Sequence, residues 1–236
     1  MTELRSKVTK RPRSKLERLL QRLEASSEIP ARPKNGIVAQ LALYYLLAGE
    51  APVPAAATAV KQLGATPAAM GQALGALERD TVAALCPAER VDDAYAALRA
   101  VGKAVADGLV AASVDVDEAR RRLRELPRMP AEQADFLLLA SGLVSTVAPG
   151  PSALRVAVRL GYPGSSYAAV ARALDAEVPE GDVAEVAWRA HHVLKLHGQR
   201  VCKERAPACG SCGVRDGCSF RGEGDDPAAR FQPSGT

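Results

Sequence analysis

Aromatic side chains and long apolar runs are scarce in this 236-residue chain. Only 4% of its residues are Phe, Trp or Tyr, and the Ala, Leu and Val that dominate instead favour helices over sheets. No run of eighteen apolar residues occurs, which excludes a membrane-spanning helix. No segment alternates between apolar and polar residues as a half-buried strand does. The sequence therefore predicts an all-α fold, long enough to bury a substantial core.

A secretory signal is also missing, because residues 1–15 (MTELRSKVTKRPRSK) are basic and lack an apolar stretch. We therefore expect a cytoplasmic protein, nucleoid-associated if it binds DNA, with reduced thiols. Six Lys or Arg against one Glu give this segment a net charge of +5, and the remainder carries −1. We interpret residues 1–14 as a flexible basic arm. Its Lys10, Arg11 and Arg13 would contact nucleic-acid phosphates, and a solubilising tail is the alternative.

Helical periodicity and capping residues predict the secondary structure. Residues 27–36 hold two prolines and a glycine and are expected to form a loop. The first four expected helices begin at Lys15, with Leu16, Leu19, Leu20 and Leu23 on one stripe; at Ile37, as a central buried helix over 37–48; at about Pro54; and at Pro67, capped by Thr66. The fifth spans 91–105 and is closed by Gly108, and the sixth follows the cap Asp115 and is stopped by Pro127. The last four span 131–143, 151–160, 166–174 and 182–197, the last with Asp182 as cap and Gly198 at its end.

Four cysteines near the C-terminus carry the clearest chemical signal. Cys202, Cys209, Cys212 and Cys218 follow the spacing C-x6-C-x2-C-x5-C. Four thiolates are the usual ligands of an iron–sulfur cluster. Structural zinc also takes four sulfurs, usually as two short-spaced pairs, and unligated or disulfide-bonded cysteines remain a third reading. Spacing alone favours iron–sulfur over zinc. Cys86 stands apart and is expected to be a small buried residue.

This cysteine spacing resembles that of the endonuclease III branch of the helix–hairpin–helix DNA glycosylases, which carry a [4Fe–4S] cluster there. The resemblance extends to the preceding run, residues 191–198 (HHVLKLHG), and to residues 66–70. It covers residues 15–220. It implies two helical lobes with DNA between them: a cluster-bearing lobe of residues 15–36 and 145–220, and a helical barrel of residues 37–144 with a degenerate helix–hairpin–helix at 118–143. Residues 221–236 would form a flexible tail.

The resemblance also implies functional positions, and several of them are altered. The family hairpin L-P-G-V-G-x-K-T-A matches residues 126–134, where Arg128 and Pro130 replace both glycines. Glu132 occupies the position of the nucleophilic lysine and cannot form its Schiff base. The family run V-D-T-H-x-F-R-V matches residues 149–156, which places Gly150 at the catalytic aspartate. Both catalytic positions are therefore vacant, and no residue is assigned a catalytic role.

The resemblance also implies positions that would contact DNA. Lys203 and Arg205, between the first two cysteines, are expected to contact phosphates, as is Arg128. The stretch that would supply a wedge residue reads Ala48-Gly49-Glu50, and a glutamate suits a DNA stack poorly. A displaced carboxylate, Glu132 or Asp135, would rescue catalysis. The plainer reading of that pair is an acidic first helical turn.

The sequence thus predicts a [4Fe–4S] DNA-binding protein without the usual glycosylase or AP-lyase chemistry, in a DNA-repair or scaffolding role, with DNA and a repair protein as candidate partners. One alternative is an active monofunctional DNA N-glycosylase that uses a displaced carboxylate. Another is a zinc- or cluster-stabilised protein-interaction module that does not bind DNA.

Overall fold

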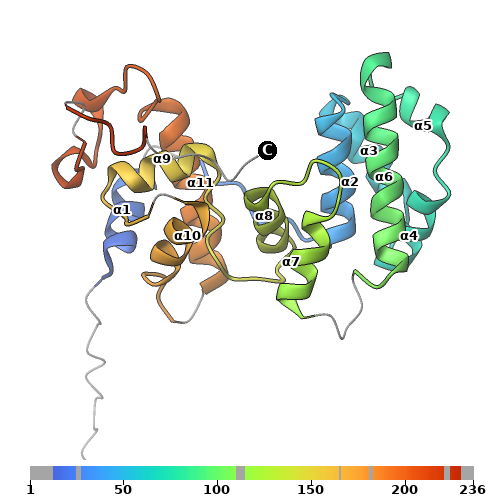
Figure 1. Cartoon of the computed structure of the whole chain (residues 1–236), viewed down its shortest axis with the longest axis horizontal. Coiled ribbons are helices and arrows are strands. Elements are labelled where there is room, and N and C mark those ends of the chain that lie inside the picture. Colours follow the sequence, from blue (N-terminus) through green and yellow to red (C-terminus); the bar gives the residue numbers. More distant parts are fainter. Residues whose placement is uncertain are drawn as a thin grey trace, which may run out of the picture.

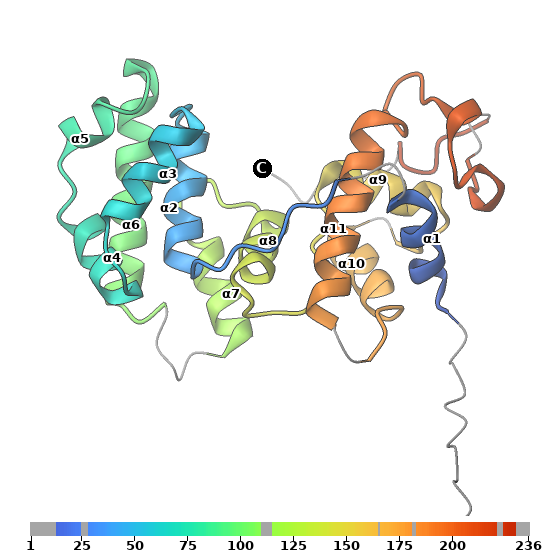
Figure 2. The ribbon, with the colours of Figure 1, turned by 180° about the vertical axis from the view of Figure 1, so that it is seen from behind.

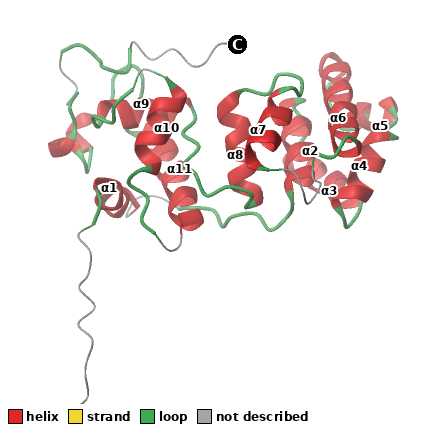
Figure 3. Ribbon diagram, turned by 60° about the horizontal axis from the view of Figure 1, so that its bottom comes forward, coloured by secondary structure: helices red, strands yellow, loops and turns green. Residues whose placement is uncertain are grey.

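The computed structural model describes residues 13–24, 28–109, 115–164, 166–180, 183–220 and 224–229. Helices and loops make up these ranges, and no strand occurs in them (Figure 3). The all-α prediction is confirmed. None of the helices in this part of the chain has the length and hydropathy needed to cross a membrane.

One group of helices is built around α2, as Figure 1 shows. Its members are α2 (Ile37–Ala48), α3 (Val53–Gln62), α4 (Pro67–Gly75), α5 (Arg79–Ala83) and α6 (Val91–Ala106). The predicted burial of α2 is confirmed, because it contacts α3, α4 and α6 and most of its side chains lie in the core. The helices α4 and α6 approach closely because Gly102 has no Cβ; an added one would collide with the backbone of Gly75.

A second group contains the two ends of the described chain. It consists of α1 (Lys15–Glu24), α9 (Pro151–Arg159), α10 (Tyr167–Asp175) and α11 (Val183–Arg200). The predicted stripe on α1 is confirmed, since its four leucines are buried. An extended segment, residues 28–36, leads from this group to α2 (Figure 2). It is fixed to α11 by Trp188, whose Nε1 donates a hydrogen bond to Pro30 O at 2.7 Å.

Two helices lie between these groups: α7 (Val116–Arg124) and α8 (Ala131–Ser141) (Figures 1 and 2). The helix α8 contacts α2 on one side and α11 on the other. The loop from α7 to α8 contacts the first group, through hydrogen bonds from α2 to Pro127 and Arg128. The exact boundaries of two lobes stay a prediction.

Most predicted caps and helices are confirmed, and one is wrong. Thr66 and Asp115 cap α4 and α7 through their side chains, whereas α5 was not predicted. Gly198 does not end a helix, because α11 continues to Arg200. It is buried against α9, and a Cβ there would lie 2.5 Å from Ser152 O. Gly198 permits close packing rather than chain reversal. The expected cap Asp182 lies outside the described residues.

Candidate functional site

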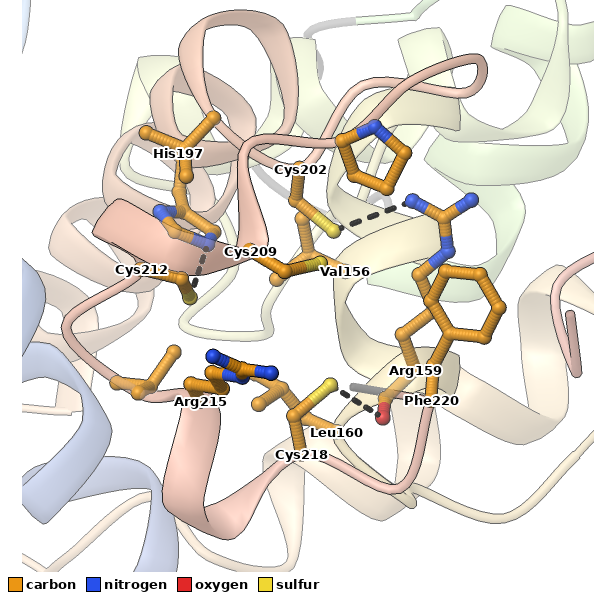
Figure 4. A pocket seen from close by; sticks show the side chains of 13 residues that line it. Val156, Arg159, Leu160, His197, Cys202, Cys209, Cys212, Arg215, Cys218 and Phe220 are labelled. Carbon is orange, nitrogen blue, oxygen red and sulfur yellow. Dashed lines mark hydrogen bonds between the residues drawn. The ribbon is translucent and has the colours of Figure 1, made fainter. Parts of the chain in front are cut away.

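The four C-terminal cysteines line one cavity, at the junction of α9, α11 and the loop after α11 (Figure 4). Their sulfur atoms face the same space, and each residue is half-buried. The remaining walls consist of apolar side chains, two arginines and one histidine: Val156, Arg159, Leu160, His197, Val201, Pro207, Val214, Arg215 and Phe220. Residues that are up to 64 positions apart in the chain, Val156 and Phe220, thus line one site with the sulfurs.

Short backbone turns hold the cysteine loop in place. The amide of Cys202 donates to His197 O at 2.8 Å, which folds the chain back at the end of α11. Two 3-10 turns, Cys209–Ser211 and Arg215–Gly217, position the later cysteines. Val214, between these turns, is buried and anchors the loop to the core. The loop is therefore anchored at Val214, while many of its other residues are exposed.

A buried cation lies beside the first cysteine. Nη1 of Arg159 donates to Cys202 Sγ at 3.3 Å. Burial raises the pKa of the Cys202 thiol, and Arg159 opposes part of that rise. On the opposite wall, His197 Nε2 lies 3.6 Å from Cys212 Sγ. Burial lowers the pKa of His197, so its ring is neutral near pH 7.

The donor set suits a centre bound by thiolates. All four cysteines are free thiols, and sulfur is the preferred ligand of zinc and iron. In the part of the chain that the structure describes, no group of three or more His, Cys, Asp or Glu side chains is arranged to share a single metal ion. The four sulfurs line the same cavity, and Cys202, Cys209, Cys212 and Cys218 would hold any cluster bound there.

The first turns of α8 carry the two carboxylates proposed as displaced catalysts. Asp135 is buried and bonded on both oxygens, to Arg120 Nε at 2.6 Å and to Tyr167 OH at 2.7 Å. It joins α7, α8 and α10. Glu132 is different, because its Oε2 is buried without a hydrogen-bond partner among the described residues. Burial, then the nearby charge of Glu132, raise the pKa of Tyr44.

Two side chains, the half-buried Asp175 and the buried His191, hold the loop that leads to Gly150. Asp175 Oδ1 accepts a hydrogen bond from Val147 N at 2.6 Å. His191 Nδ1 lies 2.6 Å from Ala148 O, and the carbonyl must be the acceptor. Burial lowers the pKa of His191 to about 3, so this contact is a neutral core hydrogen bond. Gly150 follows as the N-cap of α9, with open space where a Cβ would be.

The role of Asp175 was not predicted, because the two partners are 28 positions apart and no local motif links them. Burial raises the pKa of its carboxyl to about 6; the Val147 amide opposes this rise and the charge of Asp135 adds to it. The folded state thus favours the protonated form. The stabilisation is fully present below the unfolded pKa near ~4, and it is lost as pH rises through about 6.

Replacing Asp175 with asparagine should therefore stabilise the protein at pH 7.5. The amide oxygen can still accept from Val147 N, while the cost of ionising a buried group is removed. We expect a gain of ~1 kcal/mol, after discounting for partial exposure. Thermal unfolding from pH 4 to 7.5 would measure it. If the stability of the variant and of the wild-type protein depended on pH in the same way, the raised pKa of Asp175 would be contradicted.

The hairpin between α7 and α8 keeps a backbone conformation that glycine prefers. Arg128 has a φ of +51°, in the left-handed region, at a position that the resemblance assigns to glycine. Its guanidinium pairs with Asp93 of α6 at 2.7 Å, so its charge is partly neutralised. Tyr45 OH donates to Pro127 O at 2.8 Å and ties the hairpin to α2.

The other predicted phosphate contacts are distributed unevenly. Lys203 and Arg205 are exposed, and neither makes an ion pair within the described ranges. Arg13 is also exposed and bonds Gln21, whereas Lys10 and Arg11 lie outside the described residues. Glu50, in the stretch expected to supply a wedge, is exposed, with a φ of +63° and Arg90 at 3.7 Å.

Known proteins resemble this chain in both sequence and fold. No protein-family model matches it. Endonuclease III of Escherichia coli K12 is 33% identical over 108 residues, which are 45% of this chain and 49% of that protein. Endonuclease III of Treponema pallidum is 34% identical over 97 residues, or 41% and 44%. The chain thus spans about half the length of the curated relatives it matches.

Solved structures extend the likeness to nearly the whole chain. A trapped endonuclease III–DNA covalent intermediate, in an estranged-adenine complex, superimposes with a TM-score of 0.60. It covers 87% of this chain and 94% of that one at 17% identity. A non-covalent endonuclease III–DNA complex gives a TM-score of 0.58 at 18% identity. The predicted resemblance is therefore confirmed: this chain is similar to endonuclease III in sequence over the matched half and in fold over most of its length.

Proposed function

We propose that this protein binds DNA through an endonuclease III-like fold, carries a [4Fe–4S] cluster on its four C-terminal cysteines, and lacks the lysine-dependent lyase chemistry of that family. Its role would be in DNA repair, as a binding or scaffolding component. A repair protein is a further candidate partner.

The residues at the start of α8 are the main support for the absence of lyase chemistry. By the resemblance, Glu132 stands where the family has its nucleophilic lysine, and a carboxylate cannot form an imine with the sugar. Asp135, one turn later, is held by Arg120 and Tyr167 and is not free to activate water. Gly150 offers no side chain at the position of the aspartate. A centre without these groups would lose several kcal/mol of transition-state stabilisation.

The cysteine set supports an iron–sulfur cluster over a single zinc ion. Structural zinc is usually held by two short-spaced pairs of ligands, whereas here only Cys209 and Cys212 form such a pair. The four sulfurs line one cavity, and thiolates are the usual ligands of an iron–sulfur cluster. When bound, the cluster would supply structural cross-linking and a redox-active centre, while Lys203 and Arg205 would face phosphates from the same loop.

One observation favours a second function, that of a monofunctional DNA N-glycosylase. The buried, unpartnered Oε2 of Glu132 could accept a hydrogen bond from an attacking water. In that case the enzyme would release a base without cleaving the strand.

Binding and trapping on one substrate test these functions. We expect the full chain to bind a duplex that contains an abasic site, with an affinity that falls steeply with salt. Borohydride should trap no covalent adduct, and duplexes with oxidised pyrimidine, uracil or mismatched adenine should lose no base. The variant Glu132→Lys restores an amine at the family position and should yield a trapped adduct with the abasic site.

The matched control is Gln133→Lys, which adds the same amine one position away on α8. It should give no adduct. A trapped adduct with the wild-type protein would overturn the proposal. Base release that disappears in Glu132→Gln would establish the glycosylase instead, and absence of DNA binding at low salt would leave a protein-interaction module.

A further inference from the structure

A short segment after the cysteine loop, residues 224–229, folds back against that loop, although the sequence assigned it to a flexible tail. Its Asp226 forms a two-pronged ion pair with Arg159 of α9. Nε of Arg159 donates to Oδ1 at 3.0 Å, and Nη2 bonds Oδ2. The amide of Ala228 also donates to Asp226 Oδ1, at 2.9 Å, which fixes the carboxylate. This pairing geometry is the strongest that a carboxylate makes with arginine.

The same guanidinium holds the beginning of the cysteine loop. Nη1 of Arg159 donates to Cys202 Sγ at 3.3 Å and to Lys203 O at 2.7 Å. Nη2 donates to Glu204 O at 3.2 Å. The ring of Phe220 lies against the guanidinium, with its centroid 4.5 Å away. Three consecutive loop residues therefore depend on the position of one side chain.

Arg159 also contacts the end of the loop, through its backbone. Its carbonyl oxygen accepts from Ser219 N at 2.9 Å and from Cys218 Sγ at 3.2 Å. The residue thus touches both the first and the last cysteine of the set. No other described residue makes hydrogen bonds to both cysteine sulfurs.

This arrangement needs a counter-charge. The side chain of Arg159 is only 1% exposed, and a guanidinium keeps its proton in proteins. Within the described ranges, Asp226 is the one carboxylate paired with it. A buried charge without a partner is strongly unfavourable, so removal of the Asp226 charge should draw Arg159 toward solvent and away from Cys202.

We infer that Asp226 is a positioning residue, which acts through Arg159 to fix the loop of Cys202 and to secure the thiolate-bound centre. Residues 224–229 would thereby help to hold the cysteine site in place. The inference deepens the cofactor proposal and rests on it for the reduction potential, because charge and hydrogen bonds to sulfur set the potential of a cluster.

The test compares three full-length variants with the wild-type protein. Asp226→Asn removes the charge, Asp226→Glu keeps it, and Asp225→Asn makes the same charge change at the neighbouring exposed residue. We expect Asp226→Asn to lose absorbance near ~400 nm several-fold faster in the presence of a chelator and air. Its reduction potential should move to more negative values, because the hydrogen bond to Cys202 Sγ is lost. Asp225→Asn should match the wild-type protein, and Asp226→Glu should restore most of the difference.

A second measurement does not need the cluster. In the metal-free protein, Cys202 of Asp226→Asn should react several-fold faster with a thiol reagent than Cys202 of the wild-type protein, as peptide mass spectrometry would show. Release of the loop exposes the sulfur, and we expect this gain in access to outweigh the rise in the pKa of the thiol that loss of Arg159 causes. Equal thiol rates, or a shift to a more positive potential, would overturn the inference. If the wild-type protein holds no iron, the cofactor proposal fails, while the thiol rates still decide the role of Asp226.

Discussion

Replacing Arg120 with alanine is expected to destabilise the protein by ~3 kcal/mol. Asp135 is buried at the centre of the contact between α7, α8 and α10, and Arg120 Nε bonds it at 2.6 Å. Burial alone would lower the pKa of Arg120, but Asp135 outweighs it and the pKa is raised. Without Arg120 the carboxylate keeps only Tyr167 and the more distant Arg124, at 3.9 Å. Urea unfolding at pH 7.5 would measure the loss.

A neighbouring arginine provides the control. Arg121 lies on the exposed face of α7 and pairs with Glu118 and Glu125 there, so Arg121→Ala should change stability little. The double variant Arg120→Ala/Asp135→Asn should be more stable than Arg120→Ala alone, because it removes the unpaired charge. If the double variant is no better, loss of packing rather than of charge explains the effect.

The sequence predicted most helices because their signals are local. The leucines of α1 follow a 3.6-residue period, and Thr66 and Asp115 satisfy the first amides of α4 and α7. The prediction that a helix ends at Gly198 was wrong for a physical reason, because glycine near the end of a helical pattern usually ends the helix. Whether it ends the helix or admits a neighbouring backbone depends on α9, which lies about forty positions earlier.

The same distinction between local and remote signals applies to the candidate site. The four cysteines were found from their spacing, since they lie in one short loop. The pairs that hold the loops were not found, because their members are remote: Arg159 with Asp226, and Asp175 with Val147. Charge pairs of this kind carry no periodic signal. The ion pair of Arg128 with Asp93 likewise gives a predicted phosphate contact a partner within the protein.

Substitution of Gly198 by alanine is expected to be strongly disruptive, although it adds a single methyl group. The added Cβ would lie 2.5 Å from Ser152 O and 2.9 Å from Ser152 C, and backbone cannot move aside as a flexible side chain can. Relief requires α9 and α11 to separate. We expect a loss of ~3 kcal/mol or more, at the upper end for overpacking, measured by thermal unfolding.

The same separation should damage the cysteine cavity, because both helices line it. Arg155 on α9 donates to Gly198 O at 2.8 Å and to Cys202 O at 3.0 Å, and a shift of α11 would stretch both bonds. Cluster content should therefore fall together with stability. The control is Gly75→Ala in α4, where no atom lies within 4 Å of the new Cβ; higher helix propensity should stabilise it by about 0.5–1 kcal/mol. Wild-type stability in Gly198→Ala would show that α9 and α11 do not pack as closely as this geometry requires.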